Sequence, residues 1–273
     1  MYMIISAIAF TFLNVFVKLL NSFSVYQIIF FRSLGSLFFT TPFLLKLKIS
    51  FLGNKNKLLV LRSIFGLTSM GLFFLSLKYI DMGTSVALRY VAPVFAAMFA
   101  LVFLKEKIKP LQWLCFIIAF VGVIFLKGFE TNNSLDGILY ALFSAIFAGL
   151  VYVIIRKIGD QDHPVVIVNY FMVLSMLIGG LLSINYWVTP TLNQTLVLFS
   201  LGMFGYFAQL FMTKAMQLGE TNQVAPFKYL EVIFTMVIGV VWFSESYTVL
   251  TILGVLLIIF GIVLNIFLKQ KKV

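Results

Sequence analysis

Long apolar runs follow one another along the whole of this 273-residue chain, with only short polar breaks between them. A helix that crosses roughly 30 Å of hydrocarbon needs about 20 apolar residues. Breaks at charged, glycine, proline and asparagine positions place the expected helices at residues 2–20, 26–45, 58–77, 84–104, 110–127, 135–156, 164–185, 195–216, 223–243 and 248–268. We therefore predict an all-α integral membrane protein with ten transmembrane helices.

The composition excludes a water-soluble protein. The chain is 62% hydrophobic and 11% charged, whereas soluble domains are about 45–50% apolar and about 25% charged. The net charge of +11 does not indicate a nucleic-acid partner, because the basic residues fall in short clusters between the apolar runs. The single cysteine, Cys115, lies within an apolar run and cannot form an intramolecular disulfide, so we expect it to be a core residue.

The basic residues also predict how the chain is oriented, because lysine and arginine collect on the cytoplasmic side of a membrane. If both termini are cytoplasmic, the outer flanks hold only Lys18, Lys78 and Lys127. The inner loops and flanks then hold Lys46, Lys48, Lys55, Lys57, Arg62, Lys105, Lys107, Lys109, Arg156, Lys157, Lys214, Lys269, Lys271 and Lys272. We predict a multi-pass protein of the cell inner (plasma) membrane, with both termini inside and the first apolar run retained as a helix.

An internal repeat divides the chain into two similar halves. Residues 89–107 align without a gap with residues 228–246, an offset of 139 residues that pairs Arg89 with Lys228 and Tyr90 with Tyr229. The same offset pairs Gly66 with Gly205. Each half, residues 1–130 and 131–273, holds five expected helices, and an odd number makes the second half enter the membrane with the opposite polarity. The sequence thus predicts two inverted five-helix repeats.

Inverted repeats are a recurring plan of secondary transporters, in which exchange of the two halves' conformations opens a central site to either side in turn. The other explanation is that duplication only built a stable bundle. We favour transport, because the repeat is combined with ionisable residues inside the apolar runs.

Several motifs resemble those of the EamA-type transporters of the drug/metabolite transporter (DMT) superfamily. They are FFRSLGS around Arg32, LRYVAPVF followed by FLKEK, and PFKYLEVIF followed by FSE. The pattern LRYVAPVF is also similar to that of S-adenosylmethionine uptake carriers within the superfamily. The resemblance spans essentially the whole chain and implies transport of amino acids, nucleotide-like metabolites or drugs without ATP hydrolysis. In agreement, the chain has no G-x-x-x-x-G-K-[ST] loop for ATP.

Charges inside a bilayer are costly and usually mark a functional pathway. The residues predicted to contact the substrate are deep charges, their aromatic neighbours and polar side chains at membrane depth: Arg89, Tyr90, Lys228, Tyr229, Arg32, Gln209 and Asn14. Arg89 is the leading candidate, because Pro93 one turn later should kink the helix and open a cavity. Two alternatives stay open here: Arg32 reaches the outer surface, or Lys228 and Glu231 form a structural ion pair.

Glu231 is the only carboxylate deep within an expected helix, and if transport is driven by protons, it is the residue that we predict carries them. Arg32, Arg89 and Lys228 against Glu231 leave an excess of positive charge, which predicts a substrate with a carboxylate or phosphate. The expected partners are this small molecule, the lipid bilayer and a proton or exchanged counter-substrate, and a homodimer stays open. We expect no metal or cofactor.

Two other functions are alternatives to metabolite transport. The first is a lipid flippase or multidrug exporter of the same fold, which the residues do not exclude. The second is an intramembrane enzyme, which is disfavoured because the chain has one histidine and no H-E-x-x-H motif.

Overall fold

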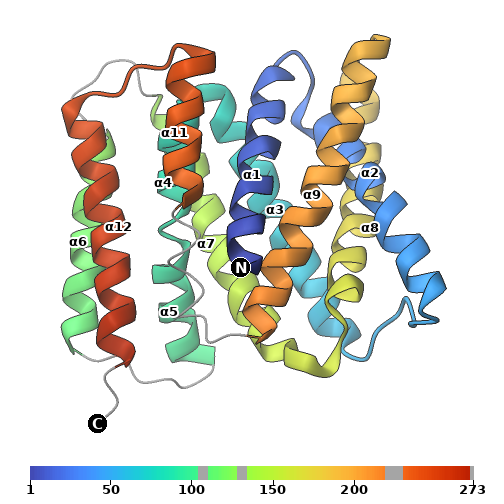
Figure 1. Cartoon of the computed structure of the whole chain (residues 1–273), viewed down its shortest axis with the longest axis horizontal. Coiled ribbons are helices and arrows are strands. Elements are labelled where there is room, and N and C mark those ends of the chain that lie inside the picture. Colours follow the sequence, from blue (N-terminus) through green and yellow to red (C-terminus); the bar gives the residue numbers. More distant parts are fainter. Residues whose placement is uncertain (104–109, 128–133, 219–229, 271–273) are drawn as a thin grey trace.

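The computed structural model describes residues 1–103, 110–127, 134–218 and 230–270, and these residues form helices and short connections without a strand. The helices are α1 (Tyr2–Leu19), α2 (Val25–Lys46), α3 (Asn56–Tyr79), α4 (Met82–Arg89), α5 (Ala92–Phe103), α6 (Pro110–Lys127), α7 (Leu135–Ile158), α8 (Pro164–Ser183), α9 (Leu192–Leu218), α11 (Leu230–Phe243) and α12 (Val249–Gln270). They form one bundle, in which α1 rises from the N-terminus and α12 descends to the C-terminus (Figure 1).

Each of the ten predicted ranges contains a helix, and the fourth contains two, α4 and α5. Seven helical stretches of the described chain are long and apolar enough to cross a membrane. Two shorter apolar stretches accompany them, Leu230–Phe243, which is α11, and Val249–Gly261, which is part of α12. The structure confirms an all-helical protein with multiple membrane-spanning candidates. The full count of ten spans stays a prediction.

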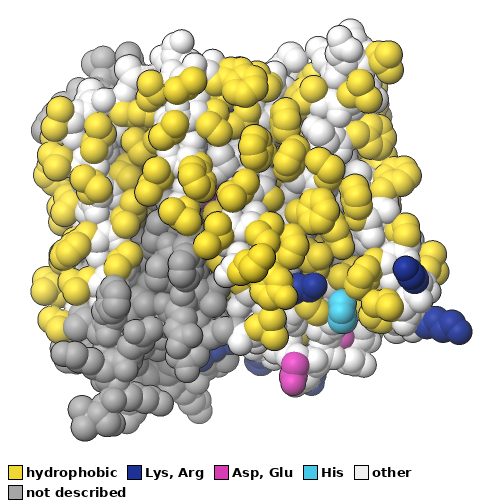
Figure 2. Space-filling view, in the orientation of Figure 1, with side chains coloured by type: hydrophobic (Ala, Val, Ile, Leu, Met, Phe, Trp, Pro, Cys, Tyr) yellow, Lys and Arg dark blue, Asp and Glu magenta, His cyan; other side chains and the backbone are white. Residues whose placement is uncertain are grey.

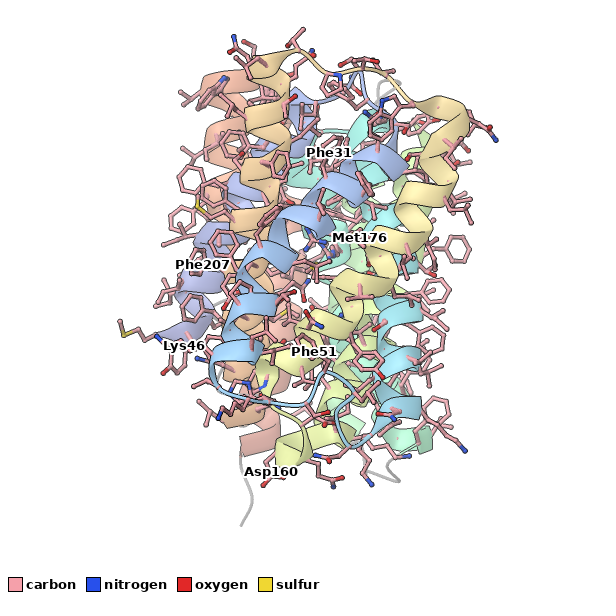
Figure 3. All side chains as sticks on the ribbon, turned by 90° about the vertical axis from the view of Figure 1, so that its right-hand side faces the viewer. Phe31, Lys46, Phe51, Asp160, Met176 and Phe207 are labelled. Carbon is pink, nitrogen blue, oxygen red and sulfur yellow. The ribbon has the colours of Figure 1, made fainter. Side chains whose placement is uncertain are left out.

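The surface of the bundle is that of a protein surrounded by lipid. Hydrophobic side chains cover most of the described face in Figure 2, whereas lysine and arginine appear in its lower half. Figure 3 places Lys46 and Asp160 near that lower end and Phe31 near the opposite end. Because an apolar surface of this extent would be unfavourable in water, the protein is a multi-pass membrane protein.

Small and hydroxyl-bearing residues allow the helices to approach closely. The hydroxyl of Ser36 on α2 donates a hydrogen bond to the Gly202 carbonyl of α9 over 2.8 Å, and a Cβ added to Gly202 would lie 2.3 Å from the Gly35 Cα. Without a hydrophobic effect to drive helices together in lipid, such close backbone contact and interhelical hydrogen bonding stabilise the packing. The crossing of α2 and α9 therefore depends on two glycines.

We expect Gly202→Ala to lower the free energy of unfolding by about 1–3 kcal/mol, because α2 and α9 must move apart to admit the methyl group. The measurement is the thermal unfolding midpoint of the purified protein in detergent. Gly71→Ala on α3 is the matched control, since its added Cβ would meet only the Ile29 Cδ1 at 3.7 Å, an ordinary contact. Equal midpoints for the two variants would contradict the proposed close crossing.

The 139-residue offset found in the sequence also relates the helices of the structure. It matches the starts of α2 and α8 and the ends of α1 and α7. The offset relates α1 to α7 and α3 to α9, so a contact between α1 and α9 predicts an equivalent contact between α7 and α3, and both contacts are present. It also relates α2 to α8 and α6 to α12, and the two helices of each of these pairs contact each other.

The helix that carries Arg89 is broken, as the proline predicts. The segment α4 ends at Arg89 and α5 begins at Ala92, so Tyr90 and Val91 lie between two helices. Pro93 has no N–H to donate to the carbonyl of Arg89, four residues earlier, and this removes a helical hydrogen bond at the break. The break places the Arg89 side chain at a helix end in the middle of the bundle.

Candidate functional site

A cavity lies within the bundle and is positively charged. Three of its lining residues are arginines, Arg32 from α2, Arg62 from α3 and Arg89 from α4. The remaining lining residues are apolar, aromatic or uncharged polar: Phe10, Leu13, Gly66, Ser69, Met70, Phe74, Ala148, Val151, Tyr152, Phe171, Gln209 and Met212. No aspartate or glutamate is among the described residues that line it. The lining of the cavity therefore combines positive charge with apolar and aromatic surface.

Arg62 is a member of this site that the sequence did not predict. We expected it in a cytoplasmic flank, but its side chain is only 1% exposed within α3. Its Nη2 donates a hydrogen bond to the Gln209 Oε1 over 2.9 Å, and its guanidinium carbon lies 4.2 Å from the centre of the Phe171 ring. The available signal was helical spacing, because Arg62 shares one face of α3 with Gly66 and Ser69.

Arg32 does not extend to the outer surface, so that alternative is wrong for this structure. Its side chain is 1% exposed, and its guanidinium carbon lies 5.9 Å from the Phe74 ring centre and 5.8 Å from that of Phe171. Its Nη1 contacts the Met70 sulfur, which is a weak acceptor. Arg32 therefore points into the cavity.

Arg89 lines the cavity as predicted, but its environment differs from that of the other two arginines. Its guanidinium carbon lies 4.3 Å from the centre of the Phe73 ring, and its side chain is half-buried. A cation over an aromatic face in a desolvated site is stabilised by about 2 kcal/mol. Arg89 is thus held at the break between α4 and α5 by an aromatic contact.

Glu231 is buried in the first turn of α11, with 3% of the residue exposed. Asn14 Nδ2 donates to its Oε1 over 3.0 Å, and the Tyr90 hydroxyl donates to its Oε2. Both oxygens of this buried carboxylate thus accept hydrogen bonds from elements of the first half of the chain. Asn14 and Tyr90, both predicted to contact substrate, instead hold Glu231 and are not among the residues that line the cavity.

The predicted Lys228 and Tyr229 lie outside the described residues, and so does the predicted Lys228–Glu231 pair. Gln209 lies at the cavity as predicted, where it orients Arg62. His163 is the N-cap of α8, and its Nδ1 accepts a hydrogen bond from the Val165 N–H over 3.3 Å. Burial and the charge of Lys214 lower the pKa of its imidazole, which keeps Nδ1 able to accept.

The centre of the cavity contains residues that the 139-residue offset relates to one another. Arg32 corresponds to Phe171, and Gly205 corresponds to Gly66. A Cβ on Gly205 would lie 2.9 Å from the Arg32 Nε, and a Cβ on Gly66 would lie 3.1 Å from the Phe171 Cε2. The same glycine position thus gives room to a large side chain in each half, and the cavity lies where the halves meet.

A second polar cluster joins the ends of α1, α4 and α11 away from the cavity. Lys18 of α1 forms an ion pair with Glu245, whose carboxylate also accepts a 3.0 Å hydrogen bond from the Met82 N–H at the start of α4. The Tyr247 hydroxyl donates to the same carboxylate. Among the described residues no group of three or more His, Cys, Asp or Glu could hold a metal ion.

Comparison with known proteins shows the family to which this chain belongs. The EamA-like transporter family matches residues 1–127 and 135–267. The chain belongs to the EamA-like transporter family. The prediction from the sequence motifs is confirmed, and so is the prediction of a transporter and not an enzyme, because the matched family and its related proteins are transporters.

Several curated EamA relatives match over most of their length. Solute carrier family 35 member G1 of Homo sapiens is 29% identical over 276 residues, 94% of this chain and 76% of that protein. The pseudopaline exporter CntI of Pseudomonas aeruginosa is 25% identical, over 94% of this chain and 91% of the exporter. The S-adenosylmethionine uptake transporter of Rickettsia prowazekii is 24% identical, over 90% and 84% of the respective chains. The exporter and the uptake transporter differ in their named substrates and directions.

A protein of known crystal structure shares the fold. It superposes with a TM-score of 0.69 at 16% sequence identity, over 98% of this chain and 99% of that chain. At this identity the likeness shows the common architecture alone. The EamA chain described here therefore has a fold already seen in an experimental structure.

Proposed function

We propose that this protein is a secondary transporter that carries a small metabolite with an anionic group through the arginine-lined cavity. The observation that carries the proposal is the gathering of the buried Arg32 and Arg62 and the half-buried Arg89 around one cavity inside an EamA-family bundle. A buried positive cluster is unfavourable unless an anion arrives, and a transporter supplies one during each cycle. Amino acids, S-adenosylmethionine-like compounds and nucleotide-like metabolites all carry such a group.

The proposed architecture is ten transmembrane helices in two inverted repeats, residues 1–130 and 131–273. The constant offset between helix ends and the exchange-related helix contacts support it. In alternating access, each half would adopt in turn the conformation of the other, which opens the cavity to one side and then to the opposite side. The protein would lie in the cell inner (plasma) membrane, and both of its termini would face the cytoplasm.

Glu231 is the proposed coupling residue, which would take up and release a proton during the cycle. Its support is the buried position and the contact with Asn14 of α1 and Tyr90 at the α4–α5 break, two elements of the first half. A change in the charge of this carboxylate would therefore alter a contact between the halves. The alternative energy source is exchange with a counter-substrate.

The Lys18–Glu245 cluster is the proposed closure on the side opposite the cytoplasm. It joins α1 and the start of α4, both in the first half, to the segment after α11 in the second half. Opening of the cavity toward that side would require these charged contacts to separate.

Single cysteines test both the orientation and alternating access. In a Cys115→Ala background, an impermeant thiol reagent should label Lys55→Cys only from the cytoplasmic side and Leu192→Cys only from outside. Met212→Cys, at a cavity-lining position, should be labelled from either side in separate vesicle preparations, because the site opens to both sides in turn. Reversed labelling at residues 55 and 192 would overturn the orientation, and labelling of residue 212 from one side only would overturn alternating access.

A further inference from the structure

We infer that the transported molecule carries two negative charges. One anionic group would bind to Arg89, and Arg32 and Arg62 would bind the second as a pair. The inference rests on the proposed transport function and deepens it by naming the substrate class. That class is a dianion with an apolar portion, and the dianion is either a dicarboxylate or a phosphate monoester.

The charge balance of the cavity arginines and Glu231 supports a double negative charge. Among the described residues no carboxylate lines the cavity beside its three arginines, and Glu231, a buried acid of the proposed pathway, is bonded to Asn14 and Tyr90. Lys18 and Glu245 neutralise each other elsewhere. Three positive charges against one negative leave 3 − 1 = +2. The charges of Arg62 and Arg89 also repel that of Arg32, so the cluster is destabilised until an anion binds.

Unsatisfied hydrogen-bond donors place the second group at Arg32 and Arg62. Within the described part of the chain, Arg32 Nε, Arg62 Nε and Arg62 Nη1 are buried without a hydrogen-bond partner. A buried donor left unpaired costs about 1–3 kcal/mol, and more when it is charged. Such donors are explained if a ligand supplies the acceptors. Carboxylate and phosphate oxygens are the acceptors that guanidinium groups bind most strongly.

The surroundings hold these donors in place and leave their edges open. Phe171 packs against the guanidinium of Arg62, and Gln209 fixes its Nη2 from α9. A side chain at Gly205 would meet the Arg32 Nε at 2.9 Å, and one at Gly66 would lie 3.4 Å from the Arg62 Nη1. Glycine therefore borders the unpaired nitrogens at both positions, and at Gly205 any other residue would crowd the Arg32 Nε.

The test uses ligands that share a carbon skeleton but differ in charge. Succinate, its monoamide and its diamide form the dicarboxylate arm, and adenosine monophosphate with adenosine forms the phosphate arm. Binding is measured at constant ionic strength from the rise in the thermal midpoint of the purified protein. We expect at least one dianion to bind ten-fold or more tightly than its less charged partner. Arg32→Gln and Arg62→Gln should each reduce this ratio to less than three-fold.

Matched variants separate binding from folding. Lys57→Gln removes the same charge from an exposed position of α3 and should retain the full preference for the dianion. Arg62→Lys keeps the charge and should show an intermediate ratio, even if Arg62→Gln fails to fold. Two results would overturn the inference: wild-type protein that binds no dianion more tightly than its partner, or Arg62→Lys with an unchanged ratio. Saturable counterflow of a singly charged or neutral metabolite by wild-type protein would refute the dianion class but leave the proposed transport function intact.

Discussion

Replacement of Glu231 by glutamine should abolish accumulation driven by a pH gradient, while exchange of substrate across the membrane is partly retained. Glutamine has nearly the same shape, and its one carbonyl oxygen can still accept a hydrogen bond from Asn14 or Tyr90, the donors to the carboxylate. It cannot carry a proton. The measurement is uptake of labelled substrate into proteoliposomes with and without an imposed pH gradient, followed by exchange at equal substrate concentration on both sides.

Glu245→Gln provides the control for this experiment. It makes the same chemical change at another buried carboxylate, which pairs with Lys18 away from the cavity. We expect its transport to keep the dependence on the pH gradient, whatever its rate. Unchanged accumulation in Glu231→Gln would mean that this residue is a structural member of its hydrogen-bond cluster and that transport is facilitated diffusion or exchange.

Replacement of Arg89 should raise the KM for the substrate, and Arg89→Ala should raise it more than Arg89→Lys. Lysine keeps the positive charge but loses the planar fork of donors that grips a carboxylate with two parallel hydrogen bonds. Hydrogen bonds to charged groups contribute about 1.5–3 kcal/mol, so we expect roughly a 10- to 100-fold increase in KM for Arg89→Ala. Initial uptake rates over a range of substrate concentrations provide the measurement.

An amidated analogue shows whether the effect of Arg89 acts on the anionic group. The analogue lacks one negative charge, so it should bind poorly to wild type and be little affected by either substitution. Arg156→Lys and Arg156→Ala, the same changes at an exposed arginine, should leave the KM for the parent unchanged. Equal transport of the parent and the amide by wild-type protein would contradict the anionic substrate class.

Features that depend on local sequence were predicted well. Pro93 predicted the break after Arg89, because a missing N–H disrupts a helix wherever the chain places it. The apolar runs predicted a helix in each of the ten ranges, because the length of a run is a property of neighbouring residues. The depth of Glu231 within its run likewise predicted that it is buried.

Features that depend on contact between distant helices were not predictable. Arg62 lies near the end of an apolar run, where a cation that snorkels to the surface and one that points inward look alike in sequence. Its inward direction follows from Phe171 on α8 and Gln209 on α9. Asn14 was predicted as a substrate contact but bonds to Glu231, which lies 217 residues away along the chain. Such pairings arise from how the helices pack, which the periodicity of each helix does not determine.

The most direct test of the central claim is counterflow in proteoliposomes reconstituted with purified wild-type protein. Vesicles loaded with an excess of an unlabelled anionic metabolite should transiently accumulate the labelled compound above its external concentration, with a rate that saturates. Only a carrier whose one site opens to each side in turn gives both properties. If a broad panel of carboxylate and phosphate metabolites shows no saturable flux, or flux without counterflow, the protein is a scaffold or a channel and the proposed transport function is wrong.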